Sequence, residues 1–197
     1  GNLLPLLTDR LVLKPHTIEN LDLYHAWEND PELLYYSDNQ PEDRQLQTLE
    51  EAREVLERII PLTDPNGRIL HFAIHTRLDD AFIGFGMIAQ IDHYHHSCRL
   101  GIAIGDPSLW GYGFGRETIA AVMEACFTRL EMNRVGAEVY DFNERSLRLF
   151  EHLGFQREGV IRQAVWKHGR YADEIIFGLL RSEWESQLQK AGKMGRS

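Results

Sequence analysis

The feature that most constrains the fold is a set of three glycines that alternate with aromatic residues between Gly111 and Gly115. The stretch from Cys98 to Ile104 before it has the apolar character of a strand, and apolar residues after it recur at helical spacing as far as Leu130. Glycine lets backbone N–H groups approach a ligand closely, and a helix start adds unpaired donors and a partial positive charge. The junction therefore predicts a phosphate or pyrophosphate site, to which Arg116 adds charge. A strand-to-helix turn without a ligand is the alternative.

Two classes of phosphate-binding loop compete for this pattern. A dinucleotide-binding unit needs a further glycine three residues after Gly113 and an acid at the end of the next strand. Asp141 satisfies the second condition, but Arg116 stands where the glycine belongs, and antiparallel strand patterns precede the loop. This disfavours an oxidoreductase that uses a nicotinamide cofactor. A Walker loop is excluded because no Gly-Lys-Ser/Thr follows.

The remaining patterns predict one mixed α/β domain over residues 8–185, followed by a polar, frayed tail over residues 186–197. Helix starts are marked by Thr17, by Asp30-Pro31, by the capping-box spacing of Thr48 and Glu51, and by Asn143. Gly154 occupies a helix C-cap position. The expected strands are 8–15, 69–76, 82–91, 98–104, 134–140, 155–161 and 174–180.

Composition narrows the class of protein. A chain of 197 residues is long enough for one hydrophobic core without disulfides. Its two cysteines, Cys98 and Cys126, suit a reducing compartment and exclude a disulfide scaffold. No apolar run reaches the ~18 residues of a membrane span, and residues 1–7 do not resemble a signal peptide. We therefore expect a cytoplasmic protein without a membrane or nucleic-acid partner, since the net charge is −9.

That charge is unevenly distributed. Residues 1–60 hold 13 acids and 5 bases, a balance of −8, whereas residues 61–197 hold 17 acids and 16 bases, a balance of −1. Residues 19–57 alone carry 12 acids and 2 bases. Either this segment attracts a cationic partner, or its acids lie on solvated helix faces.

Four segments in a fixed order resemble the GNAT superfamily of N-acetyltransferases. Leu100–Ile104 with Trp110–Glu117 resembles its acetyl-coenzyme A signature, and Asn143–Phe155 resembles its second signature. The opening Thr8–Leu13 and the closing Gly169–Asp173 are similar to the subgroup of ribosomal-protein N-terminal and spermidine acetyltransferases, called RimJ/RimL-like. The resemblance spans residues 8–185 and implies a central, mostly antiparallel sheet with a splayed parallel strand pair, flanked by helices.

The resemblance implies acetyl transfer from acetyl-coenzyme A, without a metal, by direct attack of a primary amine on the thioester. The amine would belong to a protein N-terminus, a polyamine or another small cation, and residues 19–57 would build its site. Monomer and homodimer both stay open. The residues expected to bind the cosubstrate are Ile102, Ala103, Ile104, Gly111, Tyr112, Gly113, Phe114, Gly115, Arg116, Asn143, Ser146 and Phe150.

The resemblance assigns only some of the catalytic roles to residues of this sequence. The resemblance assigns the thioester oxygen to a backbone N–H near Ile102 and a contact with the pantetheine arm to Asn143, which is alternatively a plain helix cap. Phe150 stands where many members have a proton-donating tyrosine, and Arg99 where some have a glutamate base. Glu138 and Tyr140 are substitute candidates on one strand face, and a non-catalytic acyl-coenzyme A sensor is the alternative function. The histidines at 93, 95 and 96 are expected to form a solvated loop, not a metal site.

Overall fold

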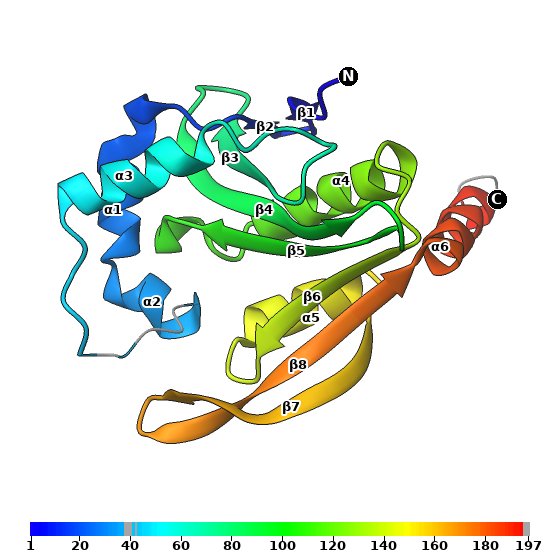
Figure 1. Cartoon of the computed structure of the whole chain (residues 1–197). Coiled ribbons are helices and arrows are strands. Elements are labelled where there is room, and N and C mark those ends of the chain that lie inside the picture. The colour runs from blue at the N-terminus through cyan, green and yellow to red at the C-terminus, as the bar shows by residue number, and fades with distance from the viewer. Residues whose placement is uncertain (38–40, 42, 195–197) are drawn as a thin grey trace.

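The computed structural model describes residues 1–37, 41 and 43–194, and its strands form a single eight-stranded sheet (Figure 1). The order is β1-β2-β3-β4-β5-β6-β8-β7, and only β5 and β6 are parallel among these strands. The expected mixed α/β fold is confirmed. The strands are β1 (Leu6–Leu7), β2 (Leu11–Lys14), β3 (Leu70–Thr76), β4 (Phe82–Asp92), β5 (Ser97–Ile104), β6 (Arg134–Tyr140), β7 (Gln156–Lys167) and β8 (Arg170–Leu180).

The helices begin largely where polar caps predict them. Thr48 accepts a hydrogen bond from the Glu51 N–H at 3.1 Å, and the Glu51 carboxylate accepts from the Thr48 N–H at 3.3 Å, which confirms the capping box. Asp30 accepts from the Glu32 N–H at 2.9 Å. The helices are α1 (Leu21–Glu28), α2 (Pro31–Ser37), α3 (Leu49–Ile59), α4 (Phe114–Thr128), α5 (Glu144–His152) and α6 (Arg181–Met194), with 3₁₀ turns at Ile18–Asn20 and Pro107–Leu109.

Three local expectations differ from the structure. Thr17 makes no side-chain cap, because a 3₁₀ turn precedes α1 and leaves Ile18 exposed. The last two strands form a longer hairpin than expected, because nearly every residue of β7 is exposed and no burial alternation marks its length. The polar residues from 186 onward continue α6 to Met194, anchored by Trp184 against Phe127 with ring centroids 5.2 Å apart.

The parallel pair opens into a gap. Register pairs join β5 to β6 only from Ser97/Arg134 to Arg99/Gly136, although β5 continues to Ile104 and β6 to Tyr140. Figure 1 shows the two strands side by side at one end and diverging toward the other. Beyond Arg99, β5 keeps β4 as a partner and β6 keeps β8, so each strand retains one hydrogen-bonded edge and exposes the other.

Different helices cover the two faces of the sheet. One core cluster packs residues of α4 and α5 against the sheet, and includes Leu100 and Val135. The other packs α1 and α3, through Trp27 and Leu56, onto Ala73 and Phe82. No helix within the described ranges is long and apolar enough to cross a membrane.

A buried histidine lies on the sheet face that α1 and α3 cover. His16 is 2% exposed and lies among the rings of Tyr24, Phe82 and Phe85, and neither ring nitrogen has a hydrogen-bond partner among the described residues. Burial lowers its pKa to about 4, with smaller contributions from the charges of nearby histidines, and a weaker effect of the Phe72 backbone opposes them.

This histidine predicts acid sensitivity. The unfolded chain binds a proton at His16 below about pH 6.5, whereas the folded protein binds it only near pH 4. Stability is therefore fully present above pH 6.5 and falls as the pH is lowered toward 4, by about 3 kcal/mol from this group. Urea unfolding at several pH values measures the loss. His16→Phe should flatten the curve in this window, whereas His152→Gln, at an exposed histidine, should leave it unchanged; parallel curves for wild type and His16→Phe would refute the assignment.

Candidate functional site

The free edge of β5 is the centre of the site. The Gly105 N–H donates to the Ile83 carbonyl at 2.8 Å, and the register continues with Ile104 opposite Gly84. Residues of an antiparallel strand alternate in the side to which their N–H and C=O point. Ala103 therefore bonds to β4, whereas the N–H and C=O of Ile102 and Ile104 face the gap.

The loop after β5 has backbone geometry that favours glycine. Gly111 and Gly113 have φ of +88° and +83°, the left-handed region that other L-residues rarely adopt. Gly113 is the N-cap of α4 and has no side chain that could accept from the helix N–H groups. The first helical hydrogen bond runs from the Glu117 N–H to the Gly113 carbonyl at 3.0 Å. The N–H groups at positions 114–116 precede that bond and lack intrahelical acceptors. The loop thus presents a set of donors suited to an anion.

The start of α4 is tied to the N-terminal segment. The Arg10 side chain donates to Glu117 at 2.7 Å, its backbone N–H donates to the same carboxylate at 3.0 Å, and its guanidinium lies 4.3 Å from the centre of the Phe114 ring. Partial burial opposes ionisation of Glu117, but hydrogen bonds from Thr8 and Arg10 outweigh it and hold the pKa of Glu117 below its usual value. These contacts orient the helix terminus.

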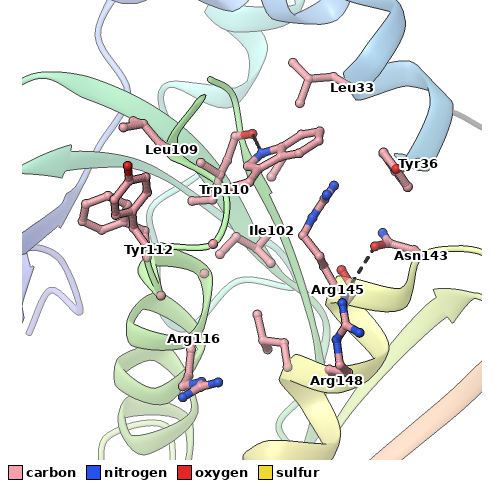
Figure 2. A pocket seen from close by; sticks show the side chains of 18 residues that line it. Leu33, Tyr36, Ile102, Leu109, Trp110, Tyr112, Arg116, Asn143, Arg145 and Arg148 are labelled. Carbon is pink, nitrogen blue, oxygen red and sulfur yellow. Dashed lines mark hydrogen bonds between the residues drawn. The ribbon is translucent and has the colours of Figure 1, made fainter. Parts of the chain in front are cut away.

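A cavity of about 590 Å³ lies between this loop, the free edge of β5 and α5. Figure 2 shows Arg116 on α4, Arg145 and Arg148 on α5, and Ile102 between the two helices. Three guanidinium groups around a glycine cradle suit a ligand with several phosphates. The lining residues are Leu33, Tyr36, Ile102, Ala103, Ile104, Leu109, Trp110, Gly111, Tyr112, Gly113, Phe114, Gly115, Arg116, Asn143, Arg145, Ser146, Arg148 and Leu149.

An aromatic cluster closes one side of this cavity. The Trp110 indole N–H donates to the Ile104 carbonyl at 2.9 Å, which satisfies one acceptor on the free edge. The Arg145 guanidinium lies 3.7 Å from the Trp110 ring centre and 4.6 Å from that of Tyr36. These contacts join α2, the glycine loop and α5 across the cavity.

Asn143 caps α5 and lines the cavity at once. Its Oδ1 accepts from the Ser146 N–H at 3.3 Å, as Figure 2 shows, so the expected cap is present. Its Nδ2 makes no hydrogen bond to another residue within the described ranges, so the amide retains its donors for a ligand.

Three sequence candidates lie elsewhere. Phe150 is 3% exposed and packs on Phe155 and Phe177 in the core, so it is absent from the described cavity lining. Its helical position turns the ring into the core, and its expected contact with the cosubstrate stays a prediction. Glu138 and Tyr140 also lie outside the lining; Tyr140 stacks on Phe142 with centroids 5.5 Å apart.

Glu138 belongs to a charged cluster at the end of the gap where β5 and β6 are still paired. Its carboxylate lies 2.5 Å from Arg99 of β5, on the sheet face opposite the buried Val139. Glu174 of β8 is close to it, and burial, followed by the contact with Glu138, raises the pKa of Glu174. The cluster therefore combines a guanidinium, a carboxylate and a carboxyl group that holds a proton more readily than usual.

A second cavity, of about 440 Å³, meets the first from the α1 and α3 side. Both cavities include Leu33, Ile102 and Ala103 in their linings. The other residues of the second are Tyr24, Trp27, Glu28, Leu34, Val55, Ile59, His71, Phe85, Gly86, Met87, Gly101 and Gly105. Sequence reasoning missed this set, since its members come from six elements, α1, α2, α3, β3, β4 and β5, and from the turn after β5. No local pattern groups them.

The acidic segment contributes little to either lining. Among the described acids of residues 19–57, Glu28 alone lines either of these two cavities, whereas Glu50, Glu51, Glu54 and Glu57 are exposed on α3. Asp38 and Glu42 lie outside the described residues. Within the described ranges, no three histidines, cysteines or acids are grouped as a metal site would require.

Comparison with known proteins agrees with this geometry. Residues 10–156 match the family described as "Acetyltransferase (GNAT) domain". The "Uncharacterized N-acetyltransferase p20" of Bacillus licheniformis is 30% identical over 91% of this chain and 97% of its own. Spermidine N(1)-acetyltransferase of Vibrio cholerae is 29% identical over 52% of this chain and 58% of its own.

Solved structures share the fold. Spermidine N-acetyltransferase from Vibrio cholerae, in complex with CoA and spermine, superposes with a TM-score of 0.76 at 23% identity, over 90% of this chain and 99% of its own. Mycobacterium smegmatis RimJ, in complex with CoA-disulfide, gives a TM-score of 0.76 at 20% identity, over 92% of this chain and 89% of its own. The likeness to these two shows the architecture.

Proposed function

The chain belongs to the GNAT acetyltransferase family, and we propose that it moves the acetyl group of acetyl-coenzyme A to a primary amine by direct attack on the thioester. The observation that carries this proposal is the free edge of β5 at Ile102, placed between a glycine cradle and a second cavity. We assign the catalytic unit to residues 8–185. The CoA complexes of the spermidine acetyltransferase and RimJ neighbours support the choice of cosubstrate.

The cosubstrate would be held by groups of different kinds. The N–H donors from Gly111 to Arg116 suit the pyrophosphate, and Arg145 and Arg148 add charge. The edge of β5 from Ile102 to Ile104 suits an extended amide-containing arm, which would pair with it as a further strand does. Asn143 and Ser146 line the same cavity. They would complete the binding site for the cosubstrate, with Asn143 Nδ2 as a further donor.

The chemistry needs little from side chains. Acetyl-coenzyme A supplies an acyl group already activated as a thioester. The amine nitrogen forms the new C–N bond while the C–S bond breaks, and the Ile102 N–H donates to the thioester oxygen as its negative charge develops. Phe150 has no proton to give, but a thiol pKa of about 8.5 makes thiolate an acceptable leaving group. The amine proton would pass through water to Glu138, with Tyr140 as the second candidate.

The test is release of free coenzyme A in the presence of a panel of primary amines. Wild type should release the thiol only when both acetyl-coenzyme A and an acceptor are present. Tight binding of acetyl-coenzyme A without turnover on any amine would instead favour an acyl-coenzyme A sensor. Turnover that is unchanged in Glu138→Gln across the pH range would remove Glu138 as proton acceptor, and a rate that does not fall with ionic strength would remove long-range attraction by the acidic segment.

Asn143 offers a matched pair of variants. Asn143→Ala should lower stability by about 1 kcal/mol, because α5 loses its cap, and should raise the KM for acetyl-coenzyme A. Asn143→Asp keeps the capping oxygen but has no N–H₂ donor, so it should retain stability and still raise that KM. Wild-type KM in Asn143→Asp would restrict Asn143 to capping.

A further inference from the structure

We infer that the second cavity selects primary amines with one positive charge and an apolar body, and admits polyamines poorly. This inference rests on the proposed function and names its acceptor class. It is carried by the shape of the cavity floor, the chemistry of its walls, and its junction with the cosubstrate cavity.

The junction sets the direction of binding. Leu33, Ile102 and Ala103 belong to both linings, so the two cavities meet at the residue whose N–H faces the gap. An amine whose body fills the second cavity would therefore present its nitrogen to the thioester position. A ligand entering from this side approaches β5 on the face opposite to α4, because Ala103 and Phe85 are paired and Phe85 packs with α1.

The floor of the cavity is small. On this face β5 presents Gly101 and Ala103, and Gly105 follows directly after the strand, whereas the other face of β5 carries Leu100, Ile102 and Ile104. The Trp27 ring lies so close to Gly105 that a Cβ there would come within 2.1 Å of it. A Cβ at Gly101 would lie 3.2 Å from Met87 Cε. The cavity on this face of β5 exists because the two glycines have no side chains, and Trp27 and Met87 bound it.

The walls are mostly apolar or aromatic. Trp27 and Phe85 stack with centroids 6.4 Å apart, and Tyr24 lies 5.4 Å from Phe85. The remaining apolar walls are Leu33, Leu34, Val55, Ile59 and Met87. A volume of about 440 Å³ falls in the usual range of small-molecule sites. Such a surface favours the binding of an apolar ligand body, since each CH₂ group that it buries contributes favourably to the free energy of binding.

Only limited charge is available to a bound cation. Among the described lining residues, Glu28 is the single carboxylate. His71 also lines the cavity, and burial lowers its pKa, so the imidazole is neutral at neutral pH and does not repel an ammonium. The second and third ammonium groups of a polyamine would lose water without gaining a partner here. Desolvation by these walls also lowers the pKa of a single bound amine and favours its nucleophilic form.

The experiment compares kcat/KM for 2-phenylethylamine, ethylamine and spermidine, with acetyl-coenzyme A affinity measured separately by calorimetry. We expect 2-phenylethylamine to exceed ethylamine by at least about tenfold and to exceed spermidine. A peptide amide with N-terminal phenylalanine distinguishes a protein terminus from a free amine as the source of the apolar body. Spermidine or ethylamine at or above 2-phenylethylamine would overturn the inference while leaving acetyl transfer intact. No turnover with any amine, despite cosubstrate binding, would remove the proposed function itself.

Gly101→Val places a side chain on the cavity floor. It should lower kcat/KM for 2-phenylethylamine by about tenfold or more and that for ethylamine by less than about threefold. Gly159→Val is the matched control, since Gly159 lies on β7 with no heavy atom within 4 Å of an added Cβ. Equal losses on both amines in Gly101→Val would overturn the inference.

Met87→Ala provides a gain that misfolding cannot imitate. Removing this side chain lengthens the cavity beside Gly101, so the ratio of kcat/KM for 4-phenylbutylamine to that for 2-phenylethylamine should rise by about threefold or more. A ratio that is unchanged or lower would count against the cavity as the acceptor site.

Discussion

Replacing Ile102 by proline is expected to lower kcat by about 10²–10³-fold, the effect of losing one oxyanion donor, while acetyl-coenzyme A still binds. The Ile102 N–H faces the gap and bonds to neither β4 nor β6 along the described pairs. Proline there removes a donor that no strand uses. The preceding Gly101 is already extended, as a residue before proline prefers to be.

The neighbouring residue supplies the control. The alternation of β5 directs the Ala103 N–H to Phe85 of β4, so Ala103→Pro breaks a sheet hydrogen bond and should lower the melting temperature markedly. Ile102→Pro should melt much closer to wild type. Single-turnover kinetics and thermal unfolding measure the two effects. If Ile102→Pro unfolds as readily as Ala103→Pro, its N–H is not free; if it is stable and fully active, the N–H does not serve the thioester.

Gly113→Ala should weaken acetyl-coenzyme A binding by about tenfold to a hundredfold. Gly113 has φ of +83°, and alanine in the left-handed region is strained by roughly 1–2 kcal/mol. Its Cβ would meet only Arg10 Nη2, at 3.5 Å, so the free protein can accommodate it. The cost falls on the ligand, because relief of the strain turns the N–H donors of the loop away from the phosphate.

Gly169→Ala separates strain from binding. Gly169 has φ of +73° at the β7–β8 turn, and no heavy atom lies within 4 Å of an added Cβ. Both variants should lose a similar free energy of unfolding, about 1 kcal/mol, but Gly169→Ala should bind acetyl-coenzyme A as wild type does. Isothermal titration and urea unfolding give both quantities. Equal affinity in the two variants would show that the loop geometry does not hold the cosubstrate.

Local signals were strongest where one or two residues decide the structure. The capping box at Thr48 and Glu51, the cap at Asn143 and the left-handed Gly154, which follows the C-cap Leu153 with φ of +91°, are side-chain or backbone preferences that act within one turn. The length of the β7–β8 hairpin was not predictable in this way. Nearly every residue of β7 is exposed, so the alternation that marks a half-buried strand is missing from it.

Side-chain direction limited the site prediction. The family resemblance places Phe150 among the cosubstrate residues, but a helix turns by about 100° per residue, and its ring points into the core beside Phe177. For the acids of α3, the sequence leaves two interpretations open, attraction of a cationic partner and a solvated helix face. These acids lie on the solvated face of α3, while Glu28 of α1 reaches the second cavity.

The sequence alone determined the mixed sheet, the glycine loop with its helix, and the family resemblance, because each depends on spacing or conformational preference over a few neighbouring residues. Tertiary structure decided which N–H groups of β5 face the gap and how the two cavities meet at Ile102. It also decided that Gly101, Ala103 and Gly105 form a floor beneath Trp27. These properties depend on the pairing of strands and helices distant in the chain, and no local pattern records which partner each residue meets.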